Sequence, residues 1–254
     1  MSTSAANKAL VTAALDAVFT RRDESALDRY FTESYLQHNP GLPSGTAPLR
    51  GLVSAGGISA RAARVLADGD LVAVHSEYTG FGPTPMVAFD IFRVEGGKIA
   101  EHWDVMQPVA EKTVSGRSQT DGPTEVEAPE RTEESRSLVK GFVDEILFAG
   151  RSEKITQFVS TERYDQHNPN VGDGLAGLGK ALEEMAKAGL PMKYEKTHRI
   201  LAEGNFVLTH SEGNFGGKHV AFADLFRVEG GKIVEHWDAI QEVPEKTASG
   251  LGMF

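Results

Sequence analysis

The stretch FRVEGGKIAEHWDVMQ, residues 92–107, returns as FRVEGGKIVEHWDAIQ, residues 226–241, and each position that differs exchanges one apolar residue for another. Other blocks repeat in the same order. YLQHNP (35–40) matches YDQHNP (164–169), RVLADGDLVAVHSE (64–77) matches RILAEGNFVLTHSE (199–212), and EKTVSG (111–116) matches EKTASG (245–250). Self-similarity of this extent indicates a tandem duplication of one small domain.

The repeat boundaries divide the chain into copy one (1–116), a linker (117–132) and copy two (133–254). The linker lacks an apolar period and is rich in proline, threonine and acidic residues, as is typical of a connection between domains. After HNP, copy two has the spacing of an amphipathic helix that ends at Gly189 and Pro191. The corresponding part of copy one is shorter and richer in glycine and proline, so we expect a shorter helix and an altered cavity there.

The formal charge of −10 argues against nucleic acid and anionic membrane surfaces as partners, since both would need a basic patch. No apolar run approaches the roughly 20 residues that span a bilayer, and the N-terminus lacks the features of a secretory signal. We therefore expect a cytoplasmic protein. The chain has no cysteine, so any metal would be held by His, Asp or Glu side chains.

Each copy begins with helical periodicity and continues with alternating apolar runs. The predicted helices cover 9–19 and 24–31 in copy one and 138–148 and 153–159 in copy two. The predicted strands of copy one cover 71–78, 86–94 and 98–106, with counterparts in copy two. EGG at 95–97 is a hairpin signal, so these strands should pair antiparallel. Helices followed by such a meander predict an α+β fold with helices on one sheet face.

Alternation along each strand sorts polar residues by face. His102 and Asp104 share one face, Asp90 lies with Phe92, and His75 lies with Glu77. We expect three strands to offer these polar groups to one pocket, because buried polar groups need partners and a convergent set is costly if unused. An aspartate in an apolar pocket would have a raised pKa, as a general base at neutral pH requires.

HNP, HSE, the Asp-x-Phe-Arg pattern and GKI-x-EHWD together resemble the SnoaL-like branch of the NTF2-like superfamily, in particular a group linked by analogy to aldol condensation. The resemblance covers both copies and implies two tandem cone-shaped α+β barrels, in which helices pack on a curved antiparallel sheet around an apolar pocket. It also implies pairing through the sheets. The partners would be the two copies, as an intramolecular pseudo-dimer, or two chains, as a homodimer.

In polyketide cyclases of this family an aspartate late in the sheet acts as acid and base, which by motif position implies Asp104 and Asp238. The resemblance also puts the HNP residues near the substrate, although HNP is equally consistent with a turn that joins helices to sheet. The candidate catalytic residues are Asp104, Asp238, His38, His167, His75, His210, His102 and His236. The candidate substrate-binding residues are Asn39, Asn168, Asp90, Asp224, Glu77 and Glu212, and the alternative for Glu77 and Glu212 is to be partners of His75 and His210.

The resulting hypothesis is an enzyme that removes a proton α to a carbonyl, for aldol cyclisation or isomerisation, without a cofactor. Its ligand would be a small hydrophobic or carbonyl-containing molecule, and copy two is the preferred active copy. Three alternatives stay open. They are a hydrolase or hydratase that activates water with Asp90 and Asp104 to attack an epoxide or similar electrophile, a binding module without turnover, and a divalent-metal site built from His38, His75 and His102, although we expect no metal.

Trp103 and Trp237, the only tryptophans, are expected in a core or interface rather than against substrate. Arg93 and Arg227 are expected as charges on the sheet surface or at an interface, since alternation puts them opposite Asp90 and Asp224. Pairing with Glu101 and Glu235 is the alternative for these arginines.

Overall fold

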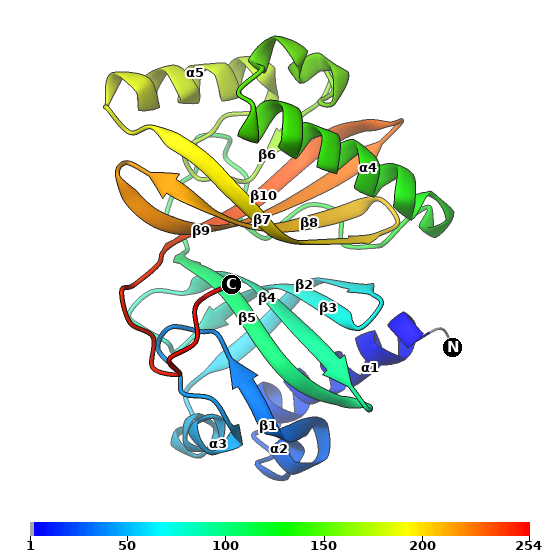
Figure 1. The fold of residues 1–254 in the computed structure, drawn as a ribbon, viewed down its shortest axis with the longest axis vertical. Helices are drawn as coiled ribbons and strands as arrows, with labels where there is room; N and C mark the ends of the chain where they lie inside the picture. The colour runs from blue at the N-terminus through cyan, green and yellow to red at the C-terminus, as the bar shows by residue number, and fades with distance from the viewer. Residues whose placement is uncertain (1–2) are drawn as a thin grey trace. The chain divides into compact units, whose positions relative to one another are not determined.

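The computed structural model describes residues 3–254 and divides into two compact units (Figure 1). The first comprises Met1–Val109 together with Val243–Phe254, and the second comprises Ala110–Glu242. These units differ at their ends from the predicted 1–116 and 133–254, and the predicted linker 117–132 lies wholly within the second unit. Each repeat's EKT-x-SG segment therefore belongs to the unit that contains the other repeat's sheet.

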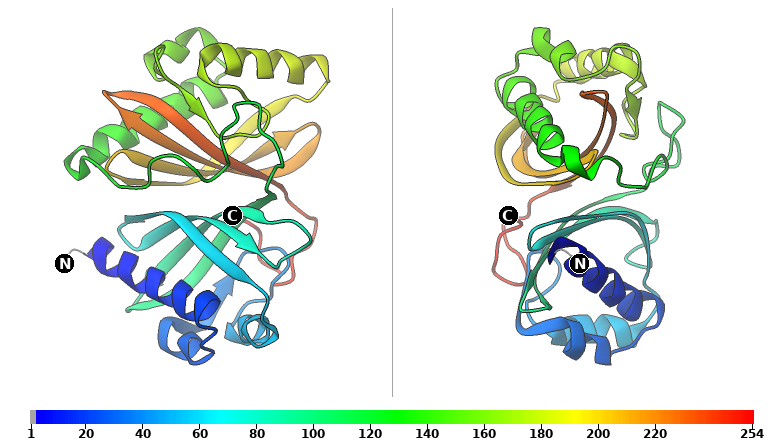
Figure 2. Two further views of the ribbon diagram at one scale, coloured as in Figure 1. Left: turned by 180° about the vertical axis from the view of Figure 1, so that it is seen from behind. Right: turned by 90° about the vertical axis from the view of Figure 1, so that its right-hand side faces the viewer.

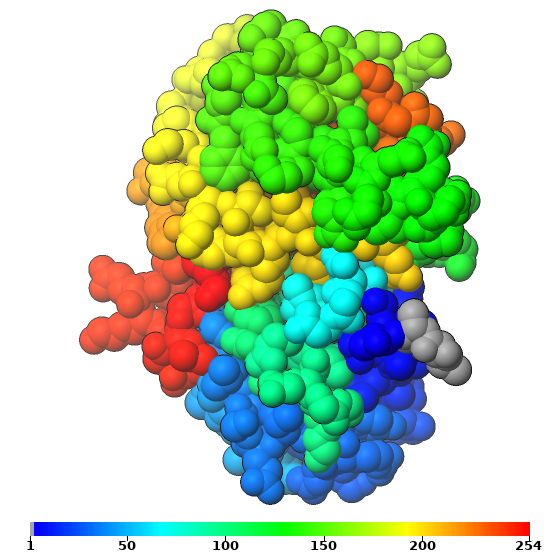
Figure 3. Space-filling model, turned by 45° about the vertical axis from the view of Figure 1, so that its right-hand side comes forward, coloured from blue at the N-terminus to red at the C-terminus, as the bar shows by residue number. Residues whose placement is uncertain are grey.

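Backbone hydrogen bonds explain this exchange of segments. The Val114 N–H donates to Pro169 O within the second unit, and the Ala248 N–H donates to Pro40 O within the first. Figure 3 shows the C-terminal tail, in red, against the blue residues of the first unit. Residues 117–132 also pack on the second unit through polar groups: the Asn205 N–H donates to Glu127 O, and Arg117 pairs with Asp165. Such contacts leave no apolar period in the sequence, so the composition suggested a linker.

The first unit has a five-stranded sheet in the order β1-β5-β4-β3-β2. Its helices are α1 (Thr3–Leu15), continued by the π-helical η1 (Asp16–Thr20), then α2 (Ser25–Tyr30) and α3 (Thr46–Ala55). Its strands are β1 (Phe31–Gln37), β2 (Ser59–Asp68), β3 (Leu71–Thr79), β4 (Met86–Glu95) and β5 (Lys98–Pro108).

The second unit repeats this architecture with the order β6-β10-β9-β8-β7. Its helical elements are η2 (Pro129–Arg131), α4 (Thr132–Phe142), η3 (Val143–Phe148), η4 (Ser152–Gln157) and α5 (Gly174–Lys187). Its strands are β6 (Asp165–Gln166), β7 (Met192–Glu203), β8 (Phe206–Phe215), β9 (Lys218–Glu229) and β10 (Lys232–Glu242). Helix α5 has 14 residues where α3 has 10, which confirms the shorter helix predicted for copy one.

The predicted α+β class and the EGG hairpin are confirmed, since β4 and β5 pair antiparallel. The sheets are nevertheless mixed rather than wholly antiparallel, because β1 pairs parallel with β5 and β6 pairs parallel with β10. Strands β1, β2, β6 and β7 were not predicted. β1 follows a helical pattern without a turn signal, and the edge strand β2 has exposed residues in its first half, which obscure a period of two.

The helices cover one face of each curved sheet, and Figure 2 shows the sheets curling around α1 and α4. In the first unit Val11 and Ala14 of α1 pack in one core with Val72, Val74 and Phe92 of the sheet. Corresponding residues of α4 and the second sheet form a similar core. We call the helix-covered side of each sheet the inner face. No helix within residues 3–254 is both long and apolar enough to cross a membrane.

Candidate active site

Three of the predicted polar residues of copy one meet on the inner face. Asp90 of β4 lies directly opposite Asp104 of β5, and Phe92 lies opposite His102. Because directly paired residues point to the same side of a sheet, all four side chains share the face on which Phe92 joins the core. Asp90, His102 and Asp104 are 3%, 7% and 5% exposed, so they form a buried polar cluster.

Hydrogen bonds connect this cluster to the strand that precedes HNP. His102 Nε2 lies 3.0 Å from Asp90 Oδ1, and His102 Nδ1 lies 2.8 Å from Gln37 Oε1. The Tyr78 hydroxyl donates to Asp90 Oδ2 at 3.0 Å. Both oxygens of Asp90 are therefore engaged, one by the imidazole and one by the phenol.

The orientation of Gln37 decides the protonation of His102. The Asn39 backbone N–H donates to Gln37 Oε1 at 2.9 Å, so this atom of the amide must be the oxygen. His102 then faces an acceptor at each ring nitrogen, an arrangement that favours the imidazolium. Burial by itself lowers the pKa of His102, but the hydrogen bond to Asp90 and the charges of Asp104 and Asp90 outweigh it, so the pKa is raised.

Asp104 is held by one oxygen only. Asn39 Nδ2 donates to Asp104 Oδ2 at 2.6 Å, while Asn39 Oδ1 accepts the Gly41 N–H at 2.9 Å, which fixes the amide. Among the described residues, none hydrogen-bonds the buried Oδ1 of Asp104. Burial raises the pKa of Asp104 to about 6, against the opposing charge of His102. Asp104 is thus a buried carboxylate with one oxygen outside the hydrogen-bond network and a pKa near neutrality.

The second unit repeats the network at corresponding positions. His236 lies 3.1 Å from Asp224 Oδ1 and 3.1 Å from Gln166 Oε1, and Asn168 Nδ2 donates to Asp238 Oδ2 at 2.6 Å. The pKa of Asp238 is also raised to about 6, chiefly by burial. For His236 the bond to Asp224 and the two carboxylate charges overcome the effect of burial, and the pKa is raised.

Four residues of the network were missed, namely Gln37, Gln166, Tyr78 and Tyr194. The glutamines lie in the repeated YLQHNP and YDQHNP blocks, so the recurrence was a signal that could have found them. The tyrosines had no such signal because they occupy different strands in the two copies.

The prediction that His75, Glu77, His210 and Glu212 face the same pocket was wrong. His75 lies opposite Phe89, one residue out of step with the inner-facing Asp90, and its ring stacks on Phe89 with centroids 4.3 Å apart. Its counterpart His210 similarly lies opposite Ala223. Alternation shows which residues of one strand share a face, but only the register between strands shows which face that is.

Glu77 and Glu212 lie, like these histidines, on the outer face of the sheet, which is the side opposite the inner face. Glu77 pairs with Arg61 at 3.2 Å, and Glu212 accepts from His198 at 2.9 Å. His75 and His210 each contact an arginine of the neighbouring strand, Arg64 at 3.1 Å and Arg199 at 3.2 Å. All four predicted site residues are thus engaged away from Asp104 and Asp238.

His38 and His167 also lie outside the cluster, although Asn39 and Asn168 lie within it. Consecutive side chains of an extended segment point to opposite sides, so HNP divides its two polar residues between the faces. His38 stacks on Trp103, with centroids 4.9 Å apart, and its Nε2 lies 2.9 Å from Glu101 Oε1. Its Nδ1 lies 2.5 Å from Gly252 O of the C-terminal tail, so His38 fastens that tail.

His167 has the same surroundings in the second unit. It stacks on Trp237 and lies 2.9 Å from Glu235, and its Nδ1 contacts Ser118 O at 2.7 Å. Both tryptophans are buried, as expected. Of the alternatives for the arginines, pairing is observed: Arg93 and Arg227 donate to Glu101 and Glu235 at 2.9 and 2.6 Å.

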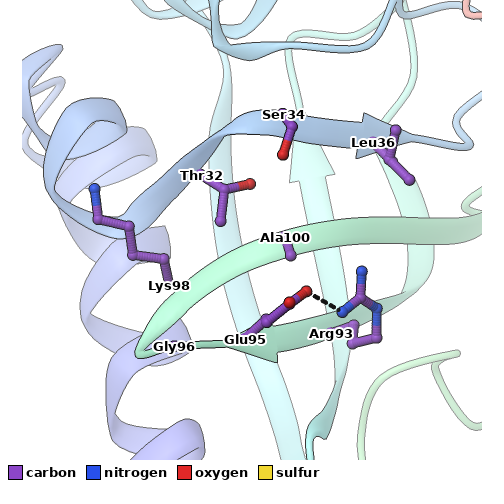
Figure 4. A pocket seen from close by; sticks show the side chains of 8 residues that line it. All are labelled: Thr32, Ser34, Leu36, Arg93, Glu95, Gly96, Lys98 and Ala100. Carbon is purple, nitrogen blue, oxygen red and sulfur yellow. Dashed lines mark hydrogen bonds and ion pairs between the residues drawn. The ribbon is translucent and has the colours of Figure 1, made fainter.

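Two surface hollows lie away from the clusters. One, of about 390 Å³, is lined by residues of β1 and the β4–β5 hairpin, among them Thr32, Arg93 and Lys98 (Figure 4). The other, of about 350 Å³, lies between η3 and β7. Asn39 and Met106, which contact each other at 3.9 Å, are half-buried, whereas Asp104 is buried.

Each cluster also has the residue types of a metal site, since ligand atoms of Asp90, His102 and Asp104, and of Asp224, His236 and Asp238, lie within 4.8 Å of one another. A metal would have to displace the proton that His102 shares with Asp90, because metal binding needs a neutral imidazole. The predicted metal trio of His38, His75 and His102 is not brought together, since only His102 is on the inner face.

The chain belongs to the SnoaL-like domain family, whose model matches residues 11–102 and again residues 139–236. No curated protein matches the sequence. TsrD from Streptomyces laurentii is similar in structure at 22% identity, over 41% of this chain and 89% of TsrD, with a TM-score of 0.36. An NTF2-like protein of unknown function from Cytophaga hutchinsonii is similar at 15% identity, over 40% and 90% of the two chains, with a TM-score of 0.35.

Proposed function

We propose that this protein is an acid–base enzyme that removes a proton from carbon α to a carbonyl group, with aldol-type cyclisation or isomerisation of a small molecule as the result. The observation that carries the proposal is Asp104, whose Oδ1 has no hydrogen-bond partner among the described residues and whose pKa is about 6. A carboxylate with these properties is largely ionised at neutral pH, yet basic enough to accept a proton. The cyclase activity implied by the SnoaL-like resemblance agrees with this chemistry.

In the proposed reaction, Asp104 Oδ1 accepts the proton from carbon, and the electron pair moves toward the carbonyl oxygen. The enolate needs a donor, and Asn39 can supply one. Its Nδ2 already donates to Asp104 and also contacts the sulfur of Met106, a weak acceptor that a carbonyl oxygen can replace. The imidazolium of His102 adds a positive charge beside the reacting groups, which stabilises the enolate further.

The surroundings of Asp238 favour an apolar substrate. Ile240 and Phe222 lie opposite each other two residues along the strands from the Asp238–Asp224 pair. They belong to an apolar cluster with Tyr194 and Val220, against which Leu147 and Phe215 pack. A substrate whose body is apolar and whose carbonyl reaches Asn168 would suit this lining.

The water-activating alternative has less support, because it needs a second carboxylate with an open oxygen. Asp90 does not offer one, since both its oxygens accept hydrogen bonds, from His102 and Tyr78. Proton transfer needs a single free carboxylate, and Asp104 provides it. The proposed base therefore acts without a second carboxylate at the same water.

Hydrogen exchange tests the first chemical step without knowledge of the product. Small apolar ketones and β-dicarbonyl compounds would be incubated with the protein in D₂O, and loss of the α-proton signal followed by NMR. We expect the double variant D104N/D238N to slow the enzyme-dependent exchange by about 100-fold or more, the usual contribution of a general base. The exposed Asp70→Asn is the matched control and should exchange like the wild type.

Exchange by the double variant at the wild-type rate would refute the aspartate base. Ligand binding by thermal shift with no exchange in the wild type would instead favour the binding module. The single variants separate the two units. We propose the second unit, with its longer α5, as the more active one, and greater loss in D104N than in D238N would reverse that assignment.

A further inference from the structure

The two units obtain the same hydrogen bond from tyrosines in different strands. In the first unit the Tyr78 hydroxyl, from β3, donates to Asp90 at 3.0 Å. In the second, the donor to Asp224 is Tyr194 of β7, whose hydroxyl lies 3.1 Å from both carboxylate oxygens. When the two copies are aligned on their repeated HSE motif, Tyr78 matches Gly213 rather than Tyr194.

The two tyrosines nevertheless occupy one structural position. Tyr78 lies opposite Ala60 of β2, and Tyr194 lies opposite Gly213 of β8. Each unit thus has, at this cross-strand pair, one tyrosine and one small residue, with the strands interchanged. Both phenols are buried and point to the inner face, where they reach the equivalent aspartate.

The backbone of the second unit is adapted to the moved tyrosine. Strand β7 has a register shift between Tyr194 and Lys196 that β2 lacks at this point. Gly213 is also required there, because a Cβ at that position would lie 2.0 Å from the Lys193 carbonyl oxygen. A tyrosine on β8 is therefore excluded in the second unit, and the opposite strand provides it.

A gene duplication copies residues that have no function along with those that have one, so inheritance explains most of the identical residues in the two units. A hydrogen bond restored from another strand cannot be inherited in this way. We propose that Tyr78 and Tyr194 are positioning residues: each compensates the charge of its aspartate, so that the shared proton stays on the histidine and the Asp–His pair beside the proposed base holds that proton less tightly. The catalytic meaning of this coupling rests on the proposed function, but the coupling itself does not.

The chemistry explains why a phenol is suitable. A buried carboxylate that accepts one bond from an imidazolium needs a second donor, or its charge is poorly compensated. Phenylalanine would leave Asp90 Oδ2 without that donor. The negative charge of Asp90 would then be less compensated, and the pair would hold the proton of His102 more tightly.

NMR titration of the histidine rings in the full-length protein without substrate tests the proposal. We expect Tyr78→Phe to raise the pKa of His102 by about one pH unit, the size expected for loss of one hydrogen bond to a charged group. Tyr194→Phe should shift His236 in the same way and leave His102 unchanged. An unshifted His102 in folded Tyr78→Phe would overturn the proposal, whether or not the protein is an enzyme.

A relocated tyrosine gives a sharper test. In the Tyr78→Ala variant, a second change, Ala60→Tyr, with one residue inserted after position 60 to reproduce the register shift that follows Tyr194, places the phenol on β2, as Tyr194 is placed on β7. We expect A60Y/Y78A to return the pKa of His102 to within about 0.3 unit of the wild-type value, since protein pKa values respond to the donor rather than to its strand. If the pKa of His102 does not return in a variant with wild-type circular dichroism, the presence of the phenol donor is not what sets that pKa, and the proposal is wrong.

The pH dependence of activity distinguishes a positioning role of Tyr78 from a purely structural one. If proton exchange is detected, the alkaline limb of its pH profile should move upward with His102 in Tyr78→Phe and back in A60Y/Y78A. If the alkaline limb of the pH profile stays in place while the pKa of His102 changes, the tyrosine has no role in catalysis. The loss of exchange in D104N/D238N tests the base independently, so the two proposals can fail separately.

Discussion

Replacement of Asp104 by asparagine should stabilise the first unit at neutral pH. The carboxyl is fully buried, and its pKa is raised from 3.8 to about 6 in the folded protein. A raised pKa means that the protonated form is favoured by folding, so this stability is present below pH 3.8 and is lost as pH rises through about 6. Asparagine, which resembles the protonated form, does not lose it.

The size of the effect follows from the pKa shift. A shift of about two units corresponds to about 3 kcal/mol between the fully protonated and fully ionised limits. Over the range from about pH 4.5 to pH 7, where part of the loss has already occurred, the free energy of unfolding of D104N should rise relative to the wild type by about 2 kcal/mol. Asn39 can still donate to the carboxamide oxygen, so the hydrogen bond is retained.

Urea unfolding followed by tryptophan fluorescence measures this quantity. Each unit has one tryptophan, Trp103 on β5 or Trp237 on β10, so a Trp237→Phe background reports on the first unit. The exposed Asp70→Asn, in the same background, is the control and should show a difference that does not vary with pH. If the difference for D104N is also constant, or falls as pH rises, Asp104 is not a buried carboxyl of raised pKa and the argument for a general base fails.

Two further pairs of variants use the duplication as an internal control. Glu235→Gln should lower the free energy of unfolding by about 3 kcal/mol and Glu101→Gln by about half of that. The reason is burial, since Glu235 and its partner Arg227 are 1% and 4% exposed whereas Glu101 is half-buried. Equal losses of stability in urea unfolding at pH 7 would contradict this reasoning. Gly204→Ala should lower the melting temperature more than Gly69→Ala, because both have positive φ but only at Gly204 would the new Cβ lie 2.1 Å from a backbone carbonyl oxygen. A melting temperature lowered equally by both would show that the segment before α4 is not packed there.

The candidate site was partly predictable because it is built on a period of two. His102 and Asp104 are two residues apart on one strand, so alternation alone places them on one face, and the repeat marks them as a shared feature. Asp90 lies on the neighbouring strand, so its place beside them depends on the register of the hairpin that EGG forms. His75 was placed wrongly because its strand is one residue out of step with Asp90, and no feature of the local sequence records that offset.

The tyrosines show a second limit of the comparison between copies. Tyr78 and Tyr194 fill one structural position from two strands, so alignment of the repeats pairs each with a small residue and hides both. Gln37 lies within a repeated sequence block, but its role as the acceptor from His102 depends on a fold that brings β1 beside β5.

The sequence by itself determined the tandem repeat, the α+β class, the EGG hairpins and the pairing of histidine with aspartate on the last strand of each unit. These features are local, because turn geometry and the alternation of a strand depend on neighbouring residues. Tertiary structure alone decided which face of the sheet each set of residues occupies, where the segments after β5 and β10 pack, and which side chains complete the Asp–His pair. These depend on strand register and on contacts between distant residues, which hydrogen bonding and burial select only when the whole unit folds.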